Sequence, residues 1–132
     1  MSLLRISARH NSARLQATLA DINAGPAAAC IEVYDGLLPS TPEAATTARL
    51  VGRVTLQVPA GEIVSHALRL LPEGDGMALL TGVAGWARLV NGAGEVVCDG
   101  ECTAADGAGP WRLSSLQLYA GGAVRLISAV LG

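Results

Sequence analysis

Residues 82–102 read GVAGWARLVNGAGEVVCDGEC, and this stretch decides the fold class. A strand is expected from Gly82 to Val90. Asn91-Gly92-Ala93-Gly94 is a strong hairpin signal, because asparagine and glycine accept positive φ at little cost. The partner strand is expected from Glu95 to Cys102. Since side chains alternate along a strand, one face carries Val96, Cys98 and Cys102 and the other carries Glu95, Asp99 and Glu101. The stretch predicts an antiparallel hairpin whose cysteines face the core.

The same kind of pattern continues on both sides of this hairpin. Alternation is clearest from Arg49 to Val58, where Leu50, Val54, Leu56 and Val58 point one way. Further strands are expected at 29–34, 66–71, 113–119 and 123–131, with a long Pro/Thr-rich connection from Leu37 to Thr47. Six or seven short strands between Gly/Pro turns are typical of an antiparallel sandwich or barrel. We expect a mainly β fold, a jelly-roll-like antiparallel β-sandwich over about residues 28–131.

One helix is expected before the strands, from about Ser7 to Asn23. Ala8, Leu15, Leu19 and Ile22 recur at spacings of three, four or seven. Ser7 is a suitable N-cap, and Gly25-Pro26 is a stop signal. With no repeat and no long linker, the sequence predicts a single domain over residues 1–132.

The composition is apolar and weakly charged. Apolar residues make up 51% of the chain, charged residues 15%, and the net charge is −2. The longest charge-free stretches, 76–87 and 113–124, fall short of the roughly 18 residues needed to span a bilayer. Residues 1–9 lack the apolar region of a signal peptide. We therefore expect a protein made in the cytoplasm, with no membrane partner. The apolar surplus indicates either a core rich in small residues or apolar surface covered by neighbouring subunits.

Nucleic acid is not expected as a partner, because nine arginines are spread singly along an acidic chain that has no lysine. No cofactor is expected either. Gly92 and Gly94 lead into a strand and not into a helix N-terminus, so they do not form a phosphate cradle.

Three cysteines form an odd set, and Cys98 and Cys102 have C-x3-C spacing. On one strand their Cα atoms would lie about 13 Å apart at roughly 3.3 Å per residue. A disulfide needs less than about 7 Å. Buried free thiols are therefore expected. Asp99, Glu101 and Asp106 could hold Ca²⁺, but a solvated strand face is the plainer interpretation.

No catalytic constellation emerges. Only His10 and His66 could act as acid–base groups at neutral pH without a large pKa shift, and neither has a recognisable triad. We expect no enzyme. Trp86 and Trp111 either fill the core or form a sugar-stacking surface.

Several stretches resemble a group of small uncharacterised proteins encoded in the structural-gene region of tailed bacteriophages and prophages. In the first half these are residues 15–22, 31–36 (Ile-Glu-Val-Tyr-Asp-Gly), 38–42 and 50–56. In the second half they are Gly82 to Val90, Val96 to Gly100, and Leu113 to Ile127 with its Ala120-Gly121-Gly122 turn. The resemblance covers most of the chain in order. It implies a virion or virion-assembly role, in the bacterial cytoplasm and then in the virion, and it provides no catalytic residue to transfer.

The leading hypothesis is therefore a phage or prophage structural protein in a head, connector or tail. Its partners would be other phage structural proteins or copies of itself, as a homo-oligomer. Arg53, Arg88 and Arg125 are candidates to orient such contacts. The alternative is a soluble ligand-binding module, for carbohydrate, that uses Trp86 or Trp111. A third hypothesis is a hydrolase that uses His66.

Overall fold

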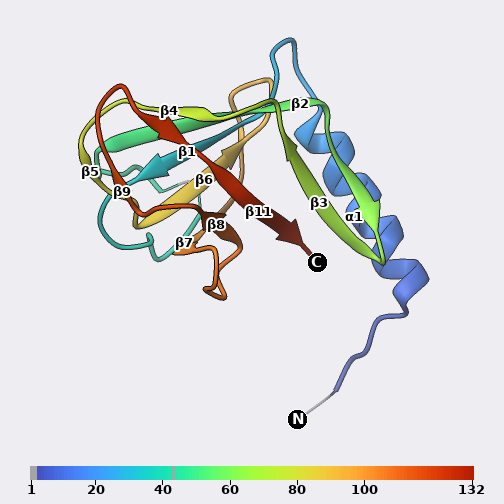
Figure 1. Cartoon of the computed structure of the whole chain (residues 1–132). Coiled ribbons are helices and arrows are strands. Elements are labelled where there is room, and N and C mark those ends of the chain that lie inside the picture. The colour runs from blue at the N-terminus through green and yellow to red at the C-terminus, as the bar shows by residue number, and fades with distance from the viewer. Residues whose placement is uncertain (1–2, 43) are drawn as a thin grey trace.

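The computed structural model describes residues 3–42 and 44–132 (Figure 1). These residues form a mainly β structure with one helix, as the sequence predicts. The elements are α1 (Ala8–Ile22), β1 (Cys30–Tyr34), β2 (Leu50–Val64), β3 (Ala67–Pro72), β4 (Gly76–Ala78), β5 (Gly82–Val83), β6 (Trp86–Val90), β7 (Val96–Ala104), β8 (Trp111–Leu113), β9 (Gln117–Leu118), β10 (Ala123–Val124) and β11 (Leu126–Leu131).

The main sheet closes into a barrel. Its strands follow the order β1-β6-β7-β8-β11-β3-β2, and β2 pairs back onto β1. The predicted sandwich is therefore wrong. The reason is the length of β2, which pairs with β1 over Leu50–Thr55 and with β3 from Leu56 to its end. One strand thus joins two regions that a sandwich would keep as separate layers. The pairing of β7 with β8 is moreover parallel, with Cys102 opposite Trp111.

The central hairpin is confirmed as β6 and β7, with Trp86 opposite Glu101 and Leu89 opposite Cys98. Asn91 closes the turn, because its Oδ1 accepts from the backbone N–H groups of Ala93 and Glu95. The first strand begins later than expected. Gly82 and Val83 form β5, which pairs separately with β9.

Large apolar side chains from around the barrel fill its core, which includes Ile31, Val33, Val54, Leu56, Leu89 and Leu113. The alternation predicted for β2 holds for Val54 and Leu56, but Val58 is exposed. The register between β2 and β3 is irregular between Leu56 and Gly61, and this irregularity turns Val58 outward.

The predicted helix is confirmed as α1, whose N-cap Ser7 accepts from the His10 N–H at 3.1 Å. It lies beside the part of the β2–β3 hairpin that projects from the barrel (Figure 1). Leu15 and Ile22 are buried. At the C-terminal end of the helix, Asn23 Oδ1 accepts from Ala60 N–H at 2.9 Å. No helix among the described residues has the length and apolarity that crossing a membrane requires.

Candidate interaction surface

Both tryptophans are buried, so neither can form the sugar-stacking or interaction surface considered from the sequence. Trp86 is 0% exposed and Trp111 is 1% exposed. Trp86 stacks on Tyr34 with ring centroids 4.6 Å apart, and its Nε1 donates to Asp35 O. Trp111 Nε1 donates to Ala87 O at 3.1 Å. Buried tryptophans with satisfied N–H groups are structural residues.

Arg88 is also internal, which corrects its assignment as a surface contact. Its Nε and Nη2 donate to the two carboxylate oxygens of Asp99 at 2.8 and 3.0 Å. Nη2 also donates to Ala44 O, and the guanidinium lies 5.2 Å from the Trp86 ring centroid. The hydrogen bond to Asp99 raises the pKa of Arg88. This ion pair holds the 35–49 connection against β6 and β7, so Asp99 is not the solvated carboxylate expected from the sequence.

Arg53 and Arg125 lie at the surface, each beside a carboxylate. Arg53 Nη2 is 3.3 Å from Glu32 Oε2. Arg125 donates to both oxygens of Asp75, at 3.2 and 3.1 Å, and these bonds lower the pKa of Asp75. Exposed pairs of this kind contribute little to stability. Both arginines are accessible, and their contact with a partner stays a prediction.

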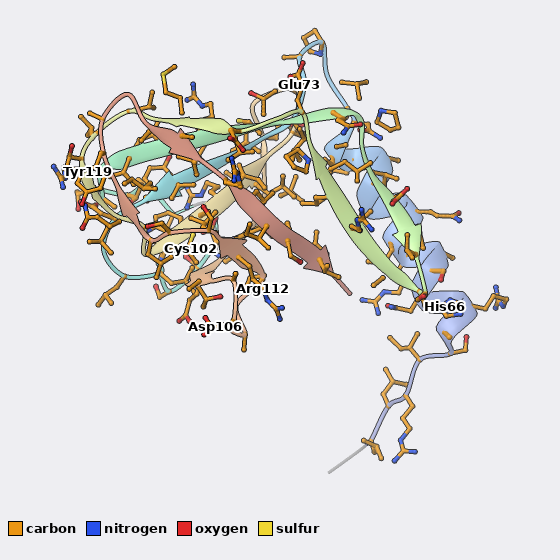
Figure 2. The ribbon with its side chains drawn as sticks, in the orientation of Figure 1. His66, Glu73, Cys102, Asp106, Arg112 and Tyr119 are labelled. Carbon is orange, nitrogen blue, oxygen red and sulfur yellow. The ribbon has the colours of Figure 1, made fainter. Side chains whose placement is uncertain are left out.

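His66 sits at the tip of the β2–β3 hairpin, beside the first turns of α1 (Figure 2). Its Nδ1 lies 2.7 Å from Ser12 Oγ, so a hydroxyl is in contact with this histidine. No other side chain hydrogen-bonds to the imidazole among the described residues. Asn11 Nδ2 donates to His66 O and Gly132 O, at 3.4 and 3.5 Å. The cluster fastens the helix to the hairpin tip and to the end of β11. In the described part of the chain, no third group is bonded to His66 to orient it as the base of a catalytic triad.

The three cysteines are free thiols, on β1 and β7. Burial raises the pKa of Cys98 to about 11 and that of Cys102 to about 12. Thiols with pKa values this high are poor nucleophiles and poor metal ligands at neutral pH. In the described part of the chain, no three His, Cys, Asp or Glu side chains are placed to hold a metal ion.

The exposed apolar side chains gather in particular places. At the end of the barrel that carries β5 and β9, backbone and side-chain hydrogen bonds tie residues 78–81 to 120–122. Large apolar side chains are exposed around this end, and Figure 2 places Tyr119 there. We call this set the loop-end surface: Met77, Leu79, Leu80, Val83 and Tyr119.

A second exposed apolar segment precedes the helix. Leu3 and Leu4 are 78% and 84% exposed, and Ile6 is also exposed. This segment, Leu3–Ile6, runs away from the body without folding back onto it (Figure 1). We call it the arm.

A concave site lies between β3 and β11. These strands pair only at Leu68–Arg69 and Val130–Leu131. Closer to the barrel they diverge and leave a cavity of about 280 Å³, lined by residues 69–72 and 126–129. We call this cavity the slot.

The sequence interpretation missed the loop-end surface, the arm and the slot. One available signal was the presence of two pairs of adjacent leucines, Leu3-Leu4 and Leu79-Leu80. Neither pair belongs to a periodic pattern. Apolar residues that no helix or strand face accounts for are candidates for exposure.

Comparison with protein-family models, with curated proteins and with solved structures finds no match for this chain. The proposals below rest on its residues and their geometry.

Proposed function

We propose that this chain is a structural or assembly protein of a tailed-phage or prophage particle, and that it acts by protein–protein contact. The loop-end surface is the observation that carries the proposal. Tyr119 and Met77, at 66% and 58% exposure, lie there with two leucines and a valine. Large apolar side chains that gather at one end of a soluble protein commonly mark an interaction site. A partner that covers this end would remove the unfavourable hydration of these side chains.

The chemistry of the interior also supports a structural role. Trp86, Trp111, Arg88 and Asp99 all serve the packing of the barrel. The carbohydrate-binding alternative depended on Trp86 or Trp111 at the surface. Because both are buried, no observation favours that alternative.

Under this proposal the chain is made in the cytoplasm of the bacterial host and then joins the particle. The partners are other phage structural proteins or further copies of this chain. Arg53 and Arg125 are candidates to orient those contacts. Their ion pairs with Glu32 and Asp75 are exposed and weak enough to exchange for a partner's carboxylate.

The test is fractionation of particles from a host that carries the gene, beside an isogenic deletion. We expect the chain to co-purify with particles at a fixed ratio to the major protein, or its deletion to reduce the yield of complete particles. A chain absent from the particles, together with an unchanged particle yield in the deletion, would contradict the proposal. The matched control is the same fraction from cells that express the chain at an equal level but make no particles.

A further inference from the structure

The slot lies where β3 and β11 are no longer paired with each other. The pairing of β3 with β11 covers only Leu68 and Arg69 on one side and Val130 and Leu131 on the other, so Leu70–Pro72 and Leu126–Ala129, all described residues, are not paired with each other. On their other sides, β3 pairs with β2 and β11 pairs with β8. An extended peptide is the kind of ligand that unpaired strand edges bind, because its own N–H and C=O groups complete their hydrogen bonds. Apolar side chains line part of this site, and Ile127 is 49% exposed.

The arm has the properties of such a peptide. It is outside any helix or strand, and three of its four residues are large and apolar. Its side chains lose water contact only if another surface covers them.

The arm cannot reach the slot of its own chain. The first turns of the helix lie beside the hairpin tip, where Ser12 Oγ contacts His66 Nδ1. The C-terminal end of the helix lies beside Ala60, whose N–H donates to Asn23 Oδ1. From Ser7 to Asn23 the rise is about 24 Å at about 1.5 Å per residue. The slot begins near the C-terminal end of the helix, because Leu70 of the slot pairs with Gly61, the residue that follows Ala60. From Ser7 back to Leu3 the chain spans at most about 14 Å. Only a second molecule can bring its arm to this slot.

Charge is also segregated in a way that favours contact between copies. Residues 1–20 contain three arginines and no acidic residue, a formal charge of +3. Residues 21–132 contain six arginines against eleven acidic residues, a formal charge of −5. The basic leading segment of one copy is therefore attracted to the acidic body of another.

The slot itself is close to neutral, so this attraction guides the approach and the apolar contact provides the affinity. Arg69 lies 3.9 Å from Glu62, and Arg125 is bonded to Asp75. The other charged groups nearby are Glu73, which follows Pro72, and Arg112, which borders Ser128.

We propose that the arm of one copy adds as an extended strand to the slot of a second copy. The proposal rests on the assembly function above, and it specifies one contact within that function. Arm and slot are different surfaces, so the contact is heterologous. It repeats from copy to copy, and it builds a ring or a helical array according to the rotation between neighbours.

The test mixes two variants that each carry one introduced cysteine beside the three native ones, so that a disulfide between the two introduced cysteines reports a contact between molecules. Leu4→Cys is mixed with Ile127→Cys under mild oxidation, and covalent dimer is measured by intact mass. The control partner is Leu37→Cys, at 92% exposure and outside the arm, the slot and the loop-end surface. The native thiols interfere little because burial raises their pKa values. Thermal unfolding of each variant checks that it is folded.

We expect at least tenfold more dimer from Leu4→Cys with Ile127→Cys than from Leu4→Cys with Leu37→Cys. Deletion of residues 3–6 from both partners should abolish self-association in sedimentation. Equal yields, a preference for Leu37→Cys, or no dimer in either mixture would overturn the arm–slot contact. The particle experiment would be unaffected by such a result, so failure of this contact and failure of the proposed function are distinguishable.

Discussion

Arg88 on β6 and Asp99 on β7 face each other directly across the central hairpin and form a two-point ion pair. The two side chains are only 9% and 4% exposed. A buried charge is tolerated when it is paired and hydrogen-bonded. This pair therefore fixes the hairpin and the 35–49 connection, which Arg88 reaches through Ala44 O.

We predict that Asp99→Asn strongly destabilises the fold, because it leaves the Arg88 charge buried without a counter-charge. Removal of one partner from a buried pair costs about 3 kcal/mol. The free energy of unfolding in urea measures this loss. The matched control is Asp75→Asn, which breaks the exposed pair with Arg125 and should change stability far less. Similar losses in the two variants would contradict the structural role of Arg88.

The buried thiols predict a loss of stability at alkaline pH. Burial raises the pKa of Cys98 to about 11 and that of Cys102 to about 12, above the ordinary thiol value of 9.0. The fold thus favours the neutral thiols. Their contribution is fully present below pH 9 and is lost as the pH rises through the folded pKa values.

Urea midpoints between pH 8 and pH 11 test this prediction. The midpoint should fall less steeply with pH in the Cys98→Ala/Cys102→Ala variant than in the parent chain. Identical pH profiles would show that these thiols ionise as easily in the folded chain as in the unfolded one. The comparison with the variant is needed because burial raises the pKa of Tyr34 as well.

Gly85 is predicted to be intolerant of any side chain. A Cβ at this position would collide with the carbonyl oxygen of Gly36. That turn cannot easily shift, because Asp35 O accepts from the buried Trp86 Nε1. Gly85→Ala should therefore cost about 1–3 kcal/mol, as overpacking does. Gly74→Ala is the control, since an added Cβ there meets no atom within 4 Å. A thermal-unfolding scan in which both variants melt together would refute this prediction.

Local signals in the sequence predicted much of the fold. The helix followed from its apolar period and from Ser7, and the β6–β7 hairpin followed from Asn91 and its glycines. Closure of the sheet into a barrel could not be predicted from local sequence patterns, because it depends on the pairing of β2 with both β1 and β3. The alternating pattern predicted a strand that ends at Val58, whereas β2 continues to Val64.

The candidate surface was harder to predict than the fold. Burial of Arg88 could not be predicted from the hairpin alone. A turn over residues 91–94 with regular pairing would place Arg88 opposite Val97, whereas the observed pairing, which is irregular between Leu89 and Val90, brings it opposite Asp99. Burial of Trp86 and Trp111 was one of two interpretations left open. Exposure of Leu79, Leu80 and Tyr119 depends on how the loops 79–81 and 119–122 meet at one end of the barrel, and the periodicity of the sequence carries no information about that.

Oxidative footprinting of the chain, free and within purified particles, tests the central claim most directly. Met77 and Tyr119 are reactive toward hydroxyl radicals, and they mark the loop-end surface. Trp86, which is buried, serves as the internal control for folding. We predict that both markers oxidise readily in the free chain and are protected severalfold in particles, with Trp86 protected in each. Equal oxidation of Met77 and Tyr119 in the two states would contradict the claim that contacts at this surface build the chain into an assembly.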